Sequence, residues 1–253
     1  MDLFSLKDKT ALITGSSEGI GLALANGLAE AGARIIINGR DKEKLSSAAE
    51  KLEEKHALVD QLSFDVTDYK QVQEKIDDYH KNNGQIDILV NNAGMQHRGP
   101  LEDFPPEMFE KLMQTNVSSI FNVGQAVARH MIEKGNGKII NIASVQTMLA
   151  RPGIAPYTTT KGAVANITKG MATDWAGKGL QINAIAPGYF ETKLTAALVA
   201  DPEFSAWLEK RTPAGRWGKV EELVGVGVFL SSAASSFVNG QTIFVDGGIT
   251  ASL

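Results

Sequence analysis

Two kinds of hydrophobic pattern alternate along the chain. Short runs that are apolar almost throughout, such as "ALIT", "RIIIN" and "IDILVN", are followed by longer stretches whose apolar residues recur at helical spacing. Runs of the first kind favour the strands of a parallel sheet that is covered on both faces. The runs that we interpret as strands are residues 10–14, 33–38, 61–65, 86–91, 138–143, 181–186 and 242–246.

The stretches between these runs predict helices. The clearest are residues 41–55, 68–81, 107–134 and 157–176, and another begins at a glycine-rich turn and runs to about Gly32. Such alternation predicts an α/β fold, a single doubly wound Rossmann-type domain over residues 1–253 with a seven-stranded parallel sheet flanked by helices. One long insertion, residues 188–217, interrupts the alternation of strands and helices, and we expect a lid or substrate loop there.

Composition and charge exclude several classes of protein. The chain carries 25 basic and 29 acidic residues, and because the basic ones are scattered we expect no nucleic-acid partner. No apolar run reaches the roughly 18 residues that span a membrane, and the start of the chain lacks a signal-peptide pattern, so we predict a cytoplasmic protein with no membrane partner. The absence of cysteine excludes disulfides, thiolate nucleophiles and cysteine-ligated zinc, and we predict no metal site.

A glycine-rich turn, "TGSSEGIG", follows the first expected strand. Gly15, Gly19 and Gly21, with Ser17 and Ile20 between them, would let the backbone approach a pyrophosphate at the positive end of the next helix. The alternative is an ordinary turn between a strand and a helix. Its place inside a strand–helix–strand unit favours a dinucleotide site.

The end of the second strand bears on which dinucleotide binds. An acidic residue there would accept a hydrogen bond from the ribose 2′-hydroxyl of NAD, whereas an arginine can pair with the 2′-phosphate of NADP. Arg40 stands at this point and favours NADP, unless it is only an exposed cation at the head of the next helix. Glu18 in the glycine turn would repel that phosphate, so NAD stays an alternative.

Two further strand ends are candidates for cofactor contact. Asp65, followed by Val66, could accept a hydrogen bond from the adenine amino group, and Asn92, Ala93 and Gly94 would let the cofactor lie close to the backbone. The alternative for each is a turn or a helix cap, where such residues are common without any ligand.

Four residues suggest acid–base chemistry without histidine or cysteine. Tyr157 and Lys161 are four positions apart on an expected helix and so share one face. The lysine ammonium, together with an oxidised nicotinamide, would favour the phenolate and lower the tyrosine pKa. Ser144, at the end of the fifth strand, could hydrogen-bond the same substrate oxygen, and Asn116 could hold a water that links Lys161 to solvent. Each has an ordinary structural explanation alone, but together they indicate proton exchange with an alcohol or a ketone.

In order and spacing these residues, with "NNAG", "YTTTK" and "APG", resemble the short-chain dehydrogenase/reductase family over essentially the whole chain. The resemblance implies hydride transfer to or from a nicotinamide, with Tyr157, Lys161, Ser144 and Asn116 as a catalytic tetrad. It also implies cofactor contacts from Tyr157, Lys161, Pro187, Gly188 and Thr192. A homotetramer built from the two long helices and the carboxyl-terminal strand region is implied as well.

A narrower resemblance concerns the substrate. "DLFSL", "LARPGIAPYT" and "KRTPAGRWG" are similar to family members that interconvert a keto-sugar acid, 5-dehydro-D-gluconate, and D-gluconate, usually with NADP. An anionic sugar acid needs a cation near the reacting carbon, and Arg98 and Arg151 are the candidates, unless they form surface ion pairs. Gln146 and Met148 complete the expected substrate set. Met148 stands where some members carry glutamate and would bind hydroxyls poorly. The alternatives are therefore a deoxy-keto-uronate or a more apolar ketone, and a non-catalytic dinucleotide-binding scaffold.

Overall fold

Seven parallel strands form one sheet in this computed structural model, which describes residues 2–55 and 57–253. The strand order is β3-β2-β1-β4-β5-β6-β7, so the chain winds outward from β1 in one direction and then from β4 in the other. This confirms the predicted doubly wound α/β fold. The strands are β1 (Thr10–Ile13), β2 (Arg34–Gly39), β3 (Val59–Ser63), β4 (Ile88–Asn91), β5 (Gly137–Ile142), β6 (Leu180–Pro187) and β7 (Thr242–Val245).

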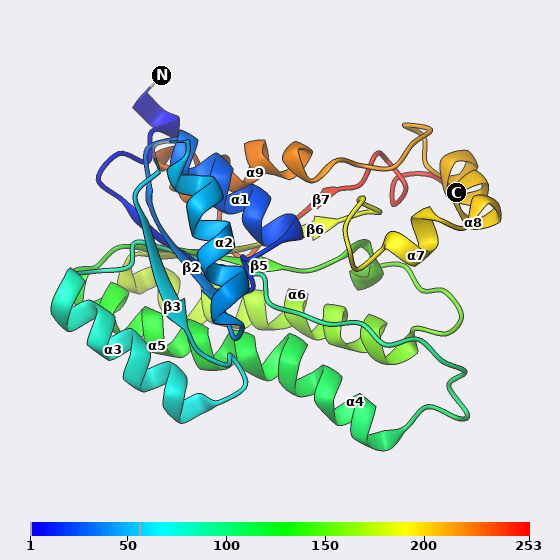
Figure 1. The fold of residues 1–253 in the computed structure, drawn as a ribbon, viewed down its shortest axis with the longest axis horizontal. Helices are drawn as coiled ribbons and strands as arrows, with labels where there is room; N and C mark the ends of the chain where they lie inside the picture. Colours follow the sequence, from blue (N-terminus) through cyan, green and yellow to red (C-terminus); the bar gives the residue numbers. More distant parts are fainter. Residues whose placement is uncertain (1, 56) are drawn as a thin grey trace.

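Helices cover both faces of the sheet. Figure 1 shows α3, α5 and α6 on one side and α1, α2 and α9 on the other, with the C-terminus beside α8. The helices are α1 (Gly19–Glu30), α2 (Lys42–Glu53), α3 (Tyr69–Asn83), α4 (Pro106–Met113), α5 (Ser119–Lys134), α6 (Ala155–Trp175), α7 (Ala196–Val199), α8 (Pro202–Arg211) and α9 (Val224–Ser231). Within the described ranges, no helix has both the length and the apolar character needed to cross a membrane.

The two covered faces explain the continuous apolar runs. Successive side chains of a strand point to opposite faces. In β1, Leu12 packs into the core beneath α3, α5 and α6, whereas Ala11 and Ile13 pack into the core beneath α1 and α2. All three are fully buried, so an apolar residue is required at every position of the strand rather than at alternate ones.

Most boundaries agree with the prediction to within about two residues, and two differences are informative. The third strand begins at Val59 rather than at residue 61, because it lies at the sheet edge, where polar residues are tolerated, and pairs with β2 alone in the described part of the chain. Its Asp60 accepts hydrogen bonds from Arg34 and from the Tyr79 hydroxyl. The single long helix predicted for residues 107–134 is α4 and α5 joined by a π-helical turn (Gln114–Ser118), a feature often found at functional sites.

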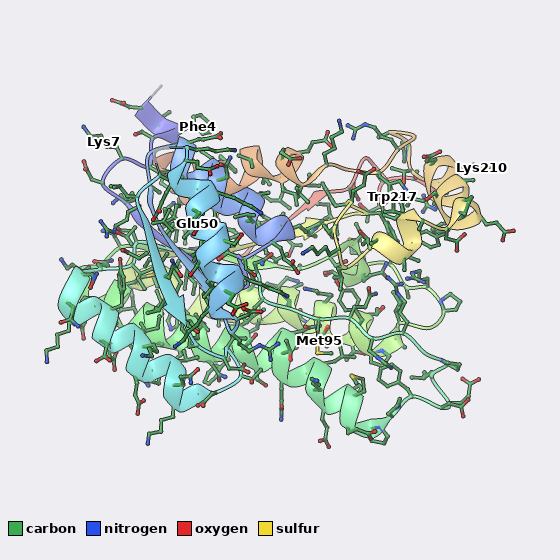
Figure 2. The ribbon with its side chains drawn as sticks, in the orientation of Figure 1. Phe4, Lys7, Glu50, Met95, Lys210 and Trp217 are labelled. Atoms are coloured by element: carbon green, nitrogen blue, oxygen red, sulfur yellow. The ribbon has the colours of Figure 1, made fainter. Side chains whose placement is uncertain are left out.

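The insertion at residues 188–217 is a structured arm that contains α7 and α8. Its two ends are joined, since Gly218 N–H donates to the Tyr189 carbonyl at 2.9 Å. Trp217 is buried and packs with Leu208 of the arm and with Val145, which follows β5, in a small apolar cluster. In Figure 2, Trp217 lies beside α8, whereas Lys210 points away from the molecule.

Candidate active site

A cavity of about 680 Å³ lies at the carboxyl ends of the strands and runs from the glycine turn to the arm. Most of the residues predicted to form the site line it: Gly15, Ser17, Gly19, Ile20, Arg40, Asp65, Val66, Asn92, Ala93, Gly94, Arg98, Ser144, Gln146, Arg151, Tyr157, Lys161, Pro187, Gly188 and Thr192. Gly21, Asn116 and Met148 do not line the cavity. Loops far apart in the sequence therefore meet at one site.

The glycine turn has the shape of a phosphate cradle. Gly15 and Gly19 have φ values of +61° and +58°, which favour glycine. A Cβ on Gly15 would lie 2.9 Å from Ala93 Cα, whereas one on Gly19 would meet no atom within 4 Å among the described residues apart from its chain neighbours and its own helix backbone. The side chain of Glu18 does not cap α1, so the N–H groups of its first turn can bind an anion. Gly21 serves packing instead, because a Cβ there would lie 2.5 Å from Asn92 Nδ2.

Two asparagines hold this turn in place. Asn92 Nδ2 donates to the carbonyl oxygens of Thr14 and Gly15 at 2.9 and 3.0 Å. Asn38 Oδ1 accepts from Gly15 N–H at 3.4 Å, and its Nδ2 donates to the Leu62 carbonyl at 2.9 Å. The side chain of Asn38 was not singled out from the sequence, although a buried amide at the end of the apolar run "RIIIN" is a usable signal.

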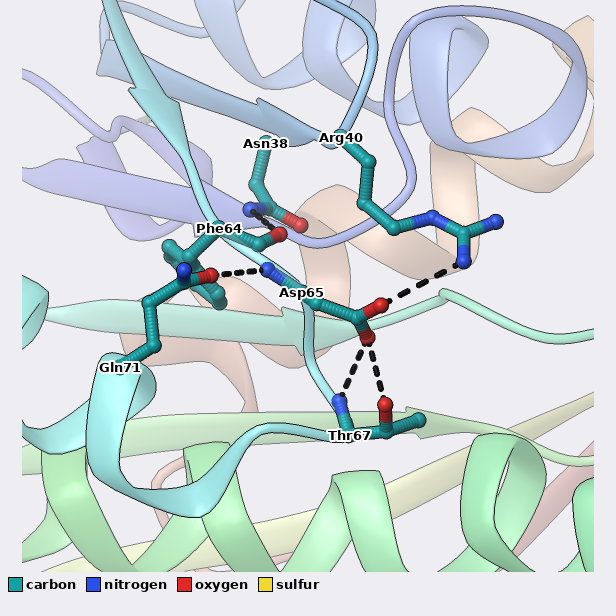
Figure 3. Close-up of polar contacts among 6 residues, drawn as sticks. All are labelled: Asn38, Arg40, Phe64, Asp65, Thr67 and Gln71. Carbon is teal, nitrogen blue, oxygen red and sulfur yellow. Dashed lines mark hydrogen bonds and ion pairs between the residues drawn. The ribbon is translucent and has the colours of Figure 1, made fainter.

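An ion pair lies at the end of the cavity next to β2 and β3. Figure 3 shows Arg40 reaching Asp65, with 3.4 Å between Nη1 and Oδ2. Asp65 Oδ1 also accepts from the N–H and the hydroxyl of Thr67 at 2.9 and 2.7 Å. Burial raises the pKa of Asp65, but these hydrogen bonds and the charge of Arg40 outweigh it, so its pKa falls below the usual value. The Arg40 side chain is 77% exposed and can exchange partners. Lys44, which the sequence analysis missed, lines the cavity four residues beyond Arg40.

The charge of Glu18 is compensated by the arm. Lys193, between β6 and α7, forms an ion pair with Glu18, and both residues line the cavity. Thr192 beside it is fixed by a hydrogen bond from its N–H to Thr195 Oγ1 at 2.9 Å. The repulsion expected from Glu18 alone is therefore offset by a cation that lies 175 residues away in the sequence.

Tyr157, Lys161 and Ser144 meet at the centre of the cavity, where β5 ends and α6 begins. Lys161 Nζ lies 5.6 Å from the centre of the Tyr157 ring and donates to the Ile142 carbonyl at 2.7 Å. Ser144 Oγ accepts from the Gln146 N–H at 3.2 Å, which fixes its position at the strand end. A hydroxyl, a phenol and an amine therefore converge here.

Burial controls the proton affinity of this group. It raises the pKa of Tyr157 to about 12, while the Ser144 hydrogen bond acts in the opposite direction and Tyr189 adds to the rise. Burial lowers the pKa of Lys161 to about 8. The expected lowering of the Tyr157 pKa is not seen in the protein itself. Removing the phenolate from water destabilises it more than the neighbouring groups stabilise it. The expectation also included the positive charge of an oxidised nicotinamide, so a lowered Tyr157 pKa with that cofactor bound stays a prediction.

Asn116 lies in the π-helical turn and is only 2% exposed. Its Nδ2 donates to the Met95 carbonyl at 2.9 Å and to Thr160 Oγ1 at 3.1 Å, and its Oδ1 accepts from Met95 N–H at 2.8 Å. Both amide protons are thus used by the protein, so a water could bind this side chain only by donating to the second lone pair of Oδ1. The three hydrogen bonds of Asn116 tie the loop after β4 to α6.

Two arginines lie at the end of the cavity nearest the arm. In both Arg98 and Arg151 the Nε atom is buried and has no hydrogen-bond partner in the described part of the chain. Within residues 2–55 and 57–253 neither forms an ion pair, although Arg151 lies 5.5 Å from the centre of the Phe204 ring. Burial and the charge of Arg151 lower the pKa of Arg98. Two guanidinium groups that line one cavity and pair with no carboxylate among the described residues favour an anionic ligand.

The other two residues of the expected substrate set occupy different environments. Gln146 is 6% exposed and lines the cavity, its Oε1 is buried without a hydrogen-bond partner in the described ranges, and its Nε2 lies 3.4 Å from the Tyr189 hydroxyl. Met148 is 69% exposed and does not line the cavity, so the structure does not bring it together with the other residues of the expected substrate set. The 3₁₀ turn that Met148 N–H closes by donating to the Val145 carbonyl at 3.0 Å carries the chain to the surface.

Comparison with known proteins agrees with this geometry. A family model described as enoyl-(acyl carrier protein) reductase matches residues 15–250. The chain is 62% identical over 252 residues to gluconate 5-dehydrogenase of Gluconobacter oxydans strain 621H, which covers 100% of this chain and 98% of the relative. It is 49% identical to 5-keto-D-gluconate 5-reductase of Escherichia coli strain K12, which covers 98% of each chain.

A solved structure matches over its whole length. The gluconate 5-dehydrogenase from Burkholderia cenocepacia J2315 in complex with NADP and tartrate is 58% identical, with a TM-score of 0.98, and the match covers 100% of this chain and 99% of that one. With the strand order and the residues that line the cavity, these matches show that the chain belongs to the short-chain dehydrogenase/reductase family.

Proposed function

We propose that this chain is an NADP-dependent oxidoreductase that interconverts 5-dehydro-D-gluconate and D-gluconate. The observation that carries the proposal is a cavity that Tyr157 lines together with a glycine turn and two guanidinium groups, those of Arg98 and Arg151. The names of the relatives in Gluconobacter oxydans and Escherichia coli support the same reaction.

The residues at the glycine-turn end fit NADP. The open side of Gly19 and the first-turn N–H groups of α1 suit a pyrophosphate, and Arg40 and Lys44 supply the cations that a 2′-phosphate requires. Pairing with Lys193 removes the objection that Glu18 would repel this phosphate. The bound nucleotide would supply the hydride that reduces the keto group. The NADP in the related Burkholderia structure supports this choice over NAD.

Tyr157 would donate the proton that the reduced oxygen needs. With a pKa raised to about 12, the phenol is protonated at neutral pH, which is the form required of a general acid. The Ser144 hydroxyl would donate a hydrogen bond to the same oxygen and hold it against the phenol. Lys161 would stabilise the phenolate left after proton transfer, since its ammonium lies beside the ring.

The substrate end of the cavity favours a carboxylate that carries hydroxyl groups. Arg98 and Arg151 would bind the carboxylate, because a guanidinium can donate two parallel hydrogen bonds to it. Gln146 would accept a hydrogen bond from a sugar hydroxyl through its buried Oε1. Exposed Met148 gives no support to an apolar ketone.

The reaction is tested by Tyr157→Phe. We expect kcat for reduction of 5-dehydro-D-gluconate to fall by about 10²- to 10⁴-fold, the range for loss of a general acid, while NADPH still binds. The matched control is Tyr69→Phe, which removes an exposed hydroxyl bonded to Gln125 on the outer surface; its rate should stay within about twofold of wild type. An unchanged rate in Tyr157→Phe would refute the catalytic proposal and favour the dinucleotide-binding scaffold.

The substrate is tested separately with Arg98→Gln and Arg151→Gln. Each should raise KM for 5-dehydro-D-gluconate by about tenfold or more and leave KM for an uncharged ketone nearly unchanged, because only the anion loses a partner. A deoxy-keto-uronate belongs in the same panel. If no sugar acid is turned over while another ketone is, then the substrate assignment fails and the reaction class survives.

Three expectations stay predictions. They are the homotetramer, the cytoplasmic location, and the role of residues 188–217 as a lid that closes over the substrate. Sedimentation velocity on the purified chain would test the first of them.

A further inference from the structure

We propose that the carboxyl-terminal ends of α3 and α5 form a binding site for a divalent transition metal ion, Zn²⁺, with His80, His130 and Glu133 as ligands. One donor atom from each of the three lies within 4.8 Å of the others. We predicted no metal site from the sequence, where these two histidines are 50 positions apart and follow no metal-binding motif. The proposal does not depend on the proposed reaction.

Parallel packing of the two helices brings these residues together. α3 and α5 lie side by side on one face of the sheet (Figure 1) and are joined at successive levels. Tyr69 bonds Gln125, Gln73 bonds Arg129 and Asp77 bonds His130, at sequence separations of 56, 56 and 53. One turn after Asp77, His80 therefore reaches the level of His130 and Glu133. Both helices end here, where their dipoles favour a cation.

A hydrogen bond fixes the ring of His130 in the form that binds metals. Its Nε2 lies 2.8 Å from Asp77 Oδ1, and since a carboxylate only accepts, Nε2 carries the proton. In the neutral ring the lone pair is then on Nδ1. That atom is buried, has no hydrogen-bond partner in the described ranges, and lies 4.0 Å from Glu133 Oε2. A carboxylate that orients a histidine from behind is the usual outer shell of a metal ligand.

The second histidine completes the donor set. The rings of His80 and His130 are stacked, with centres 4.0 Å apart and planes 14° apart. Because the lone pair of an imidazole nitrogen lies in the ring plane, one ring would turn so that both Nδ1 atoms face the same ion. His80 Nδ1 is also buried and lacks a hydrogen-bond partner among the described residues.

Two imidazole nitrogens and a carboxylate oxygen are a donor set that suits Zn²⁺. The carboxylate can move to complete the site, because the Glu133 side chain is 73% exposed, and water can take the fourth position. Ile76, Ile86 and Val127 line the space beneath the two rings and keep it apolar. β4 and β5 begin soon after the ends of α3 and α5, so this site lies near the amino ends of the strands, whereas the cavity lies at their carboxyl ends. Its metal would join two helices rather than take part in the reaction.

The direct test is a calorimetric titration with Zn²⁺ of the full-length chain, purified without a histidine tag and freed of metal with a chelator. We expect one Zn²⁺ per chain with a dissociation constant on the order of 1 µM or lower, and a higher thermal midpoint when Zn²⁺ is bound. Glu133→Gln and His80→Gln should each weaken binding at least about tenfold. Asp77→Asn should weaken it about 10- to 100-fold without changing the stoichiometry, because Asp77 positions His130 rather than binding the ion.

His97→Gln is the matched control, since His97 packs against Phe104 outside the cluster, and its Zn²⁺ affinity should equal that of wild type. Glu133→Gln alters an exposed side chain, so the variant is expected to fold, and an unchanged thermal midpoint without metal would verify this. The proposal is overturned if wild type binds no stoichiometric Zn²⁺. Equal affinity in wild type and Glu133→Gln would also overturn it, as would a thermal midpoint that depends on pH but not on Zn²⁺.

Discussion

Replacing Lys161 by methionine should abolish most of the activity and yet remove a cost to folding. The ammonium is 7% exposed, and among the described residues its side chain bonds the Ile142 carbonyl and no carboxylate. Burial therefore lowers its pKa from 10.5 to about 8. Methionine has a similar length, packs well in irregular apolar space and carries no charge.

The magnitude follows from proton linkage. A tenfold change in proton affinity corresponds to 1.36 kcal/mol, so a pKa lowered from 10.5 to about 8 costs the folded protein about 3 kcal/mol. Below about pH 8 both folded and unfolded chains hold the proton, and the full cost is present. Between about 8 and 10.5 only the unfolded chain binds it, so stability contributed by Lys161 rises with pH and reaches its limit above about 10.5.

The assay is urea unfolding of wild type and Lys161→Met between about pH 7 and pH 10.5. The free energy of unfolding of wild type should rise relative to the variant by about 3 kcal/mol across this range. The variant leaves the Ile142 carbonyl without its donor, which lowers its stability by about 1–3 kcal/mol. This loss is the same at every pH, so it does not change how the difference between the two proteins varies with pH. Lys169→Met, which removes an exposed ammonium on the same helix, should show no such trend. A flat difference for Lys161→Met would refute the reasoning.

Four further substitutions test other parts of the site. Lys193→Ala leaves Glu18 uncompensated beside the phosphates, so the dissociation constant of NADPH, measured by its fluorescence, should rise about 2- to 10-fold, and an unchanged value at low salt would contradict this. Gly21→Ala places a methyl 2.5 Å from a side-chain nitrogen that supports the glycine turn, and calorimetry should show about 1–3 kcal/mol less stability. Met148→Gln should leave kcat/KM within about twofold of wild type, whereas Gln146→Leu should raise KM for the sugar acid about tenfold; equal effects would contradict the assigned positions.

The sheet could be predicted because its inner strands are buried on both faces. Burial on both faces requires a continuous apolar run in β1, β2 and β4. Such a run can be recognised in the sequence without knowing which strands lie beside it. The bounds predicted for the edge strand β3 were shifted along the sequence. One side of this strand pairs with no other described strand, so polar residues such as Asp60 and Gln61 are tolerated and the apolar run is incomplete. The π-helical turn around Asn116 could not be predicted, since one extra residue in a helix leaves the apolar spacing almost unchanged.

The residues that line the cavity could be predicted where they depend on local spacing. Tyr157 and Lys161 share a helix, and Ser144 lies two residues after the strand before it. Contacts that depend on distant segments were missed, such as the pairing of Glu18 with Lys193. Met148 was misplaced for a different reason, because a single 3₁₀ turn decides whether a residue near Ser144 faces the cavity or the solvent.

The pairing of Glu18 with Lys193 makes two distant positions one unit for natural selection and for protein engineering. Loss of the carboxylate alone leaves a free ammonium near the nucleotide and should strengthen the preference for NADP, while loss of the ammonium alone should weaken it. Loss of both should return the preference close to its starting value. The pair can therefore drift together without any visible change in coenzyme use, and the residue in the glycine turn is a poor guide to coenzyme choice unless residue 193 is considered with it.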